Sequence, residues 1–219
     1  FYGQTRSPWM DDTTILWPFF RWSHDKETGY KEYRVPFPFL IWGEGPDQSR
    51  FDLWPLFGFR SRGDYSRHFF LWPIERWEYS ETEEYRQAHL WILPFFSSHH
   101  REYKDGSGRD LKTTFWPLLR YEERRDGFLE ISAIHPLWFD DPLLNFDTLL
   151  APLWTLFRYT RDSEGYEHLN VLFGLYSSRS TPQGEHRWDI LGGLVGHTSN
   201  PGGDATAPGK TRLFWALEF

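Results

Sequence analysis

The chain has 219 residues, a formal net charge of −7 and no cysteine, and aromatic residues make up 20% of it. The lack of cysteine excludes disulfide frameworks, thiolate zinc sites and cysteine nucleophiles, and the negative charge gives no electrostatic basis for binding nucleic acid. No run of 18 apolar residues occurs, so no membrane-spanning helix is expected, but a membrane barrel is compatible because its signal is alternation.

Residues 1–12 are interpreted as a lead-in to the first predicted strand, which contains "TTILWPFFRW" at 13–22. From there, a proline or small residue after an apolar pair recurs at spacings of 16 to 23 residues, often as Leu-Trp-Pro. The repeat has a period of about 19 residues and predicts an internally repeated fold. We call the aligned position of the repeat, which follows the apolar pair, the column. Its residues are Pro18, Pro36, Pro55, Pro73, Pro94, Pro117, Pro136, Pro152, Gly174, Gly193 and Ala216.

Segments of turn-forming residues separate successive residues of the column. They are rich in Gly, Asp, Ser and Pro, which supply the backbone conformations that hairpin turns need. Alternating apolar runs between such segments predict antiparallel strands. The segments lie at 24–30, 43–49, 61–65, 80–85, 100–110, 122–128, 140–147, 161–168, 177–185 and 197–210.

The proline column allows two interpretations. Because proline cannot donate to a strand ladder, each proline marks either a bulge in mid-strand or a tight corner between two short strands. We favour the bulge, because Gly174, Gly193 and Ala216 continue the column without other turn residues. The expected fold is therefore all-β: an up-and-down antiparallel meander of about 11–12 strands in a single domain, 1–219, closed or nearly closed into a barrel. Residues 198–210 are expected to form a long loop before the last strand.

The predicted strand centres are apolar on both faces, as in the run from Phe69 to Ile74. Such strands fit a membrane barrel with a packed interior, a soluble barrel or sandwich with a second layer, or a self-assembling sheet. A single sheet exposed to water is excluded under this interpretation, because one of its faces would have to be polar.

The chain ends in "KTRLFWALEF", in which alternate residues are apolar and the last is aromatic. This ending resembles the C-terminal assembly signal of bacterial outer-membrane β-barrels. The resemblance covers about nine residues and identifies a class rather than a family. It implies a barrel in the outer membrane, and the residues that carry it are Leu213, Trp215, Leu217 and Phe219.

Few residues suggest chemistry. His99, His100 and Glu102 are the densest group of potential metal ligands, but adjacent residues on a strand point to opposite faces. His135 replaces tryptophan in the repeat column, where a hydrogen-bonded core histidine is the plainer interpretation. The paired acids at 11–12 and 140–141 are interpreted as exposed or turn residues. The sequence predicts no catalytic, metal or cofactor site.

Arginines follow the apolar centres and could line a barrel interior, form ladders with acids across strands, or lie in water at strand ends. They are Arg21, Arg60, Arg76, Arg120 and Arg158.

The sequence therefore predicts a non-enzymatic β-barrel or β-repeat protein of a bacterial envelope, located in the outer membrane or outside the cell. Its role would be structural or in passage of solutes, with the lipid bilayer or other envelope proteins as partners. One alternative is a secreted β-repeat protein that self-associates through strand edges. The other is a soluble scaffold that binds carbohydrate through exposed Trp42 and Trp188. An enzyme is not expected.

Overall fold

The computed structural model describes residues 1–134, 155–215 and 217–219. These residues form 21 antiparallel strands and two short 3-10 helices, which confirms the predicted all-β meander. They divide into two compact units, Phe1–Asp105 and Gly106–Phe219. Within each unit, every strand pairs with the strand that follows it in sequence.

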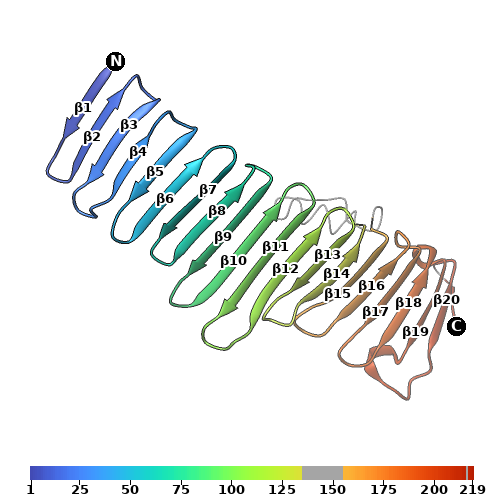
Figure 1. The fold of residues 1–219 in the computed structure, drawn as a ribbon. Coiled ribbons are helices and arrows are strands. Elements are labelled where there is room, and N and C mark those ends of the chain that lie inside the picture. Colours follow the sequence, from blue (N-terminus) through green and yellow to red (C-terminus); the bar gives the residue numbers. More distant parts are fainter. Residues whose placement is uncertain (135–154, 216) are drawn as a thin grey trace. The chain divides into compact units, whose positions relative to one another are not determined.

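The first unit contains strands β1 to β11 (Figure 1); β1 lies in the predicted lead-in and β2 begins there. They are β1 (Tyr2–Arg6), β2 (Met10–Ile15), β3 (Phe20–Asp25), β4 (Lys31–Arg34), β5 (Leu40–Glu44), β6 (Gln48–Leu53), β7 (Phe57–Arg62), β8 (Tyr65–Phe70), β9 (Glu75–Glu81), β10 (Tyr85–Ile92) and β11 (Phe96–Tyr103).

The second unit contains β12 to β21, and its described loop 200–209 lies within the long loop predicted at 198–210. Its elements are β12 (Arg109–Phe115), β13 (Leu119–Glu123), β14 (Leu129–Ala133), β15 (Phe157–Arg161), β16 (Glu167–Val171), β17 (Tyr176–Ser180), β18 (His186–Ile190), η1 (Leu191–Gly193), β19 (Val195–Ser199), η2 (Pro201–Gly203), β20 (Lys210–Leu213) and β21 (Leu217–Glu218).

The predicted mid-strand bulge is wrong. Every described column residue lies between two strands, in a turn or bend or, for Gly193, in the 3-10 helix η1. Each predicted repeat unit therefore contains two short strands, and the described residues form about twice the expected number of strands. A proline in such a turn removes no ladder bond, which explains why the motif tolerates it. We call these apolar turns corners. In the first unit they lie at 16–19, 36–39, 53–56, 71–74 and 92–95.

The proline corners share one geometry. In each, the amide N–H of the fourth residue donates to the carbonyl oxygen of the first over 2.8–3.0 Å, and the third residue is a cis-proline, as in a type VI turn. In the corner at 36–39 the cis-proline is Pro38, so the column residue Pro36 is displaced by two positions. The cis-prolines are Pro18, Pro38, Pro55, Pro73, Pro94 and Pro117.

The later corners use left-handed backbone instead of proline. At 172–175, Phe173 and Gly174 have φ of 58° and 78°, and the Leu175 N–H donates to the Leu172 carbonyl. These values describe a type I′ turn, which favours Asn-Gly. These corners contain no polar turn residues, so in the sequence they look like part of a continuous strand.

Each sheet is open. No pairing of described residues joins β1 to β11 in the first unit, or β12 to β21 in the second. The expected closed barrel is therefore not formed by the described residues. The ladder lies between neighbouring strands only, and hairpins alternate between two edges of the sheet (Figure 1).

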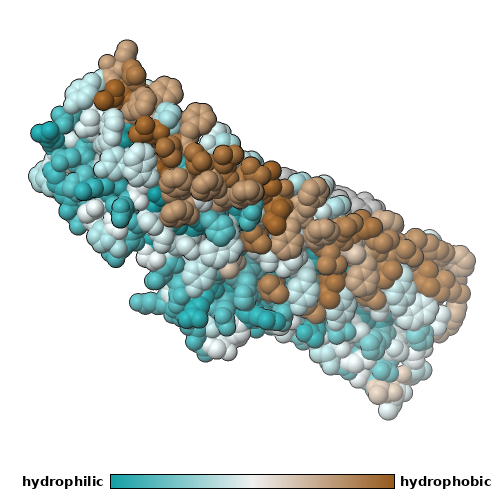
Figure 2. Space-filling view, viewed as in Figure 1, coloured by the Kyte–Doolittle hydropathy of each residue, from teal (hydrophilic) through white to brown (hydrophobic). Residues whose placement is uncertain are grey.

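The corners and the predicted polar turns lie at opposite edges, which we call the corner edge and the hairpin edge. Over the first unit, apolar side chains gather along the corner edge and hydrophilic side chains along the hairpin edge (Figure 2). Each predicted turn segment contains a turn in the structure, except the segment 140–147, which lies outside the described residues.

Within residues 1–105 the sheet is a single layer, without a covering helix or second sheet. Two apolar side chains are almost completely buried there, Ile41 at 3% exposed and Phe69 at 8%. The exclusion of a single sheet is thus wrong, because the apolar centre on which it was based is a corner. In the strands themselves the two faces differ, one being charged and the other aromatic.

Candidate functional site

The corner edge of the first unit exposes large apolar side chains. Trp17 is 79% exposed, and several other corner side chains are about half exposed. A contiguous exposed apolar surface of this kind marks an interaction site. Eleven strands at a spacing of about 4.8 Å extend this edge over roughly 48 Å. Its members include Leu16, Trp17, Phe19, Phe39, Leu56, Leu71, Trp72, Ile74, Leu93 and Phe95.

A row of rings crosses one face of the first unit. Residues directly opposite one another in an antiparallel ladder share a face, and the register aligns one ring from each of seven consecutive strands, β3 to β9. Tyr33 stacks on Trp42 with centroids 5.0 Å apart, and His68 on Trp77 at 4.8 Å. We call this face the aromatic face. Its row consists of Trp22, Tyr33, Trp42, Phe51, Phe59, His68 and Trp77.

On the aromatic face, side-chain polarity increases from the corner edge to the hairpin edge. Between the corners and the ring row lies a largely apolar row that includes Leu40, Leu53, Phe57 and Phe70. On the other side of the ring row, towards the hairpin edge, lies a largely polar row that runs from His24 to Ser66. The ring row therefore separates an apolar zone from a polar zone.

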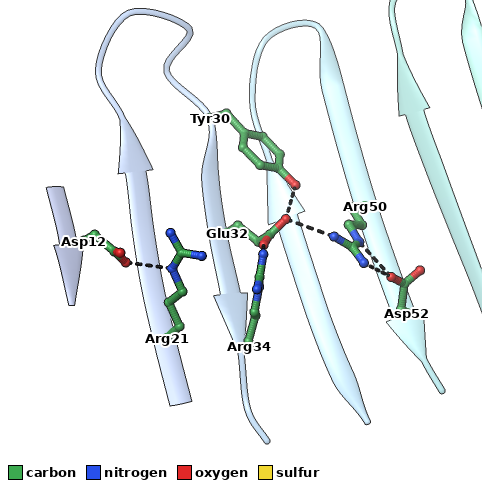
Figure 3. A network of polar contacts seen from close by, with 7 residues as sticks. All are labelled: Asp12, Arg21, Tyr30, Glu32, Arg34, Arg50 and Asp52. Carbon is green, nitrogen blue, oxygen red and sulfur yellow. Dashed lines mark hydrogen bonds and ion pairs between the residues drawn. The ribbon is translucent and has the colours of Figure 1, made fainter. Parts of the chain in front are cut away.

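The opposite face carries ion pairs, and we call it the charged face. Arg21 binds Asp12 at 2.9 Å, Arg34 binds Glu32 at 2.8 Å, and Arg50 bridges Glu32 at 3.3 Å and Asp52 at 2.6 Å (Figure 3). Four of these residues link β4 to β6. The predicted ladder of arginines with acids across strands is confirmed for Arg21, and for Arg158 of β15, which binds Glu130 of β14; Arg76 instead binds Glu78 of its own strand.

Burial and charge shift the acidities in this network. Burial would raise the pKa of Glu32, but the hydrogen bonds and charges of Arg34 and Arg50 outweigh it and lower the pKa below its usual value. The Tyr30 hydroxyl donates to Glu32 at 3.2 Å, and burial together with that carboxylate raises the pKa of Tyr30 to about 12. Glu32 is thus held as a charged acceptor.

Two glycines make room on this face. A Cβ on Gly43 would meet the Tyr30 ring, and a Cβ on Gly58 would lie 2.5 Å from Asp52 Oδ1 and against the Phe69 ring. The aromatic that closes the 24–30 turn therefore packs over a later strand, β5, rather than over the strand that precedes it.

The second unit repeats this division of faces. Arg120 and Glu122 form a buried ion pair at 3.1 Å, and Arg158 binds Glu130 at 3.2 Å on the same face. The other face carries Tyr121, Ile131 and Tyr159 at matching positions. Its exposed corner-edge side chains include Leu118, Leu172, Phe173, Leu191, Phe214 and Trp215.

The C-terminal residues form a hairpin rather than one strand. Leu213 and Leu217 are opposite each other in β20 and β21. Trp215 lies in the intervening corner and its Nε1–H donates to the Gly192 carbonyl. The Phe219 N–H and carbonyl both bond to Thr211. Leu213, Trp215 and Leu217 thus lie at or beside the corner edge, whereas Phe219 lies further along the strand, and all four but Leu213 are exposed by more than half.

His99 and His100 lie on opposite faces of β11, as predicted, with His99 stacked on His89 at 5.0 Å and His100 opposite Ala88. The described residues contain no group of three or more His, Asp or Glu side chains that could hold a metal ion. Trp42 and Trp188 lie in strands β5 and β18 rather than at loop ends. His135, Pro136, Pro152, Ala216 and the acids at 140–141 lie outside the described residues.

Sequence reasoning missed the ring row. Its members recur at spacings of 8 to 11 residues, but they appear as a row only when the strand register is known. The signal that could have revealed it is the symmetry about each corner, since a ring commonly lies three residues from a corner on either side.

The chain matches no protein-family model, no curated protein and no solved structure. None of the helices among the described residues has the length and apolar character needed to cross a bilayer.

Proposed function

We propose that the protein is a non-enzymatic β-repeat protein of a bacterial envelope whose corner edge enters one leaflet of a lipid bilayer. The observation that carries the proposal is the order of side chains on the aromatic face: apolar corners, then rings, then polar residues at the hairpin edge. Hydrocarbon, interfacial Trp and Tyr, and hydrated headgroups follow in the same order from the middle of a bilayer to water.

The depth of the apolar zone supports this orientation. Trp22, Phe59 and Trp77 each lie three residues from the last or first residue of a corner, which is about 10 Å along a strand. Segments that lie in a membrane interface bury their apolar side about 5–10 Å deep. Insertion of the corners would thus bring the ring row to the level of the headgroups.

Strand length favours lying in one leaflet over spanning. Strands of the first unit have four to eight residues, whereas a membrane-spanning strand needs about nine to eleven. In an open sheet, a spanning strand would also expose the charged face to lipid along its whole length. Attachment therefore fits the geometry better than a barrel that passes solutes, and the envelope location is supported by the C-terminal resemblance.

The corner residues themselves support a surface role. Leu16 and Leu71 have left-handed backbone, with φ of 50° and 48°, a conformation that Asn and Gly adopt at less cost than leucine. Leucine there is unfavourable for folding and leaves an apolar side chain exposed. Each half-exposed Leu, Phe or Trp that enters hydrocarbon gains about 1 kcal/mol.

Flotation with phosphatidylcholine vesicles tests the proposal. The double variant Leu16→Asn with Leu71→Asn should bind vesicles about 30-fold more weakly than the wild type, because two apolar side chains that each contribute about 1 kcal/mol no longer enter lipid. Asp64→Asn, at the hairpin edge, is the matched control and should bind like the wild type. If the wild-type protein stays with the unbound fraction, the proposal is wrong.

The ring row favours a second candidate function, the binding of carbohydrate on the aromatic face. Trp42 is 38% exposed and Phe59 48%, and exposed rings can stack on sugars as they do on other planar or apolar groups. Trp42→Ala should then abolish retention on a polysaccharide column. Self-association through strand edges and contact with other envelope proteins stay predictions.

A further inference from the structure

Two arginines face each other on the charged face of the first unit. Arg60 of β7 lies directly opposite Arg67 of β8, and like charges in this position repel. Both side chains are partly exposed, and within residues 1–105 neither forms an ion pair or a side-chain hydrogen bond. The sheet thus holds two adjacent cations that nothing in the first unit neutralises.

The surrounding acids are already engaged. Glu32 binds Arg34 and Arg50, and Asp52 binds Arg50. Glu78, which lies opposite Arg67, binds Arg76 and accepts from the Tyr65 hydroxyl at 3.0 Å. Three carboxylates therefore balance three arginines, which leaves Arg60 and Arg67 as adjacent arginines without an ion pair and Arg62 as a third, nearer the hairpin edge.

A cavity of about 190 Å³ lies on the Arg67 side of this pair, and its lining includes Arg50, Arg67 and Arg76 together with the acid Asp52, which binds Arg50. The same cavity is lined by Trp54 and Trp72, which belong to two corners. It has room for several water molecules, and hence for a phosphate group. The cavity therefore joins the cationic row of the charged face to the corner edge.

We infer that Arg60 and Arg67 bind the phosphate of a phospholipid headgroup, whose acyl chains lie beside the corners at Trp54 and Trp72. The inference rests on the proposed function. Arginine pairs with phosphate through two parallel N–H···O bonds, and a phosphate with one or two negative charges matches the uncompensated charge. The lipid source is favoured over free phosphate because the cavity is continuous with the apolar edge.

The test uses the full chain and two kinds of vesicle, phosphatidylcholine alone and phosphatidylcholine with one-fifth phosphatidic acid. The wild type should prefer the vesicles with phosphatidic acid. The variant Arg60→Gln with Arg67→Gln should lose about 25-fold in affinity for them, or about fivefold for each arginine. Its affinity for phosphatidylcholine alone should change far less, and its thermal midpoint should stay equal or rise because the repulsion is removed.

Arg62→Gln is the matched control, because Arg62 shares β7 and the charged face with Arg60 but lies nearer the hairpin edge. It should weaken binding by about twofold through general attraction. An equal loss in this control would overturn the inference in favour of diffuse attraction. Unchanged binding of the double variant would overturn it while leaving the proposed function intact.

Inorganic phosphate separates the two sources of the ligand. Millimolar phosphate should compete only weakly with phosphatidic acid vesicles, since it lacks acyl chains. If micromolar phosphate saturates the pair and abolishes vesicle preference, a free phosphate is the ligand and the lipid assignment is wrong. If the wild type binds neither kind of vesicle, the proposed function and this inference both fail.

Discussion

The indole rings of Trp54 and Trp72 pack together with centroids 5.9 Å apart and an interplanar angle of 47°. The β7–β8 hairpin lies between them in the chain, so each belongs to a different corner. Phe39 packs on Trp54 in turn, at 6.0 Å. Rings of three successive corners, at 36–39, 53–56 and 71–74, therefore contact one another, and this part of the corner edge is a continuous surface rather than a series of separate turns.

Gly58→Ala should destabilise the first unit. The added Cβ would lie 2.5 Å from Asp52 Oδ1 and against the Phe69 ring, and overpacking of this kind costs about 1–3 kcal/mol. Urea unfolding measures the loss. Gly3→Ala is the control, because a Cβ there meets nothing within 4 Å; a similar loss in both variants would contradict the packing described for Gly58.

Glu32 should make stability depend on acidic pH. Burial would raise the pKa of Glu32, but Arg34 and Arg50 lower it more strongly, so this pKa is lower in the folded protein than its ordinary value of 4.5. Its stabilisation is therefore fully present above that value and is lost as the pH falls through the folded-state pKa. Unfolding free energies measured between pH 7 and pH 2 should fall more steeply for the wild type than for Glu32→Gln.

At neutral pH, Glu32→Gln should also cost about 1–3 kcal/mol, because Arg34 loses its charged acceptor. Glu27→Gln removes the same charge from an exposed turn and serves as the control. Parallel pH curves for the wild type and Glu32→Gln would show that Glu32 carries no such linkage.

Phe173→Asn should keep or raise stability although it removes a large apolar side chain. Phe173 has φ of 58° and precedes Gly174 in a type I′ turn, so the variant contains the favoured Asn-Gly pair and should gain up to about 1 kcal/mol. Phe19→Asn is the comparison, since Phe19 is equally exposed at 49% and its φ is not left-handed. Both variants should weaken vesicle binding, and chemical denaturation should separate them.

Lys104→Met should raise the pKa of Glu81. Hydrogen bonds from Lys104, Tyr79 and Arg86 lower the pKa of this carboxyl to about 2, and the Lys104 ammonium lies 2.7 Å from Glu81 Oε1. Carbon-detected NMR titration of the glutamate carboxyls should show the pKa moving towards 4.5 in the variant. An unchanged titration would mean that Lys104 does not hold Glu81 in solution.

The hairpin edge was predictable from the sequence and the corner edge was not. Segments such as 61–65 and 122–128 contain Gly and Asp, whose local backbone preferences identify turns. The corner at 172–175 contains Leu, Phe and Gly in left-handed backbone, and the described proline corners place Trp, Phe or Leu before a cis-proline. These residues look like strand residues, so two short strands were counted as one.

The same miscount affected the candidate site. Treating Leu71 and Trp72 as the centre of a strand made both faces apolar, whereas the register of β8 and β9 places arginine and acid on one face and rings on the other. Arg60 shows what the sequence could not predict. It was visible as one of the arginines that follow the apolar centres, but its position opposite Arg67 follows only from the strand register.

The central claim is that the corner edge, and not the hairpin edge, enters lipid. The chain has no cysteine, so single labels can be attached at Leu56→Cys in a corner and at Asp64→Cys at the hairpin edge. When the labelled protein is bound to vesicles, the emission of an environment-sensitive fluorophore at position 56 should shift to the blue and resist aqueous quenchers. The emission of the same fluorophore at position 64 should stay unshifted and accessible to the quencher. Two aqueous labels, or two buried ones, would contradict insertion of the corner edge into one leaflet.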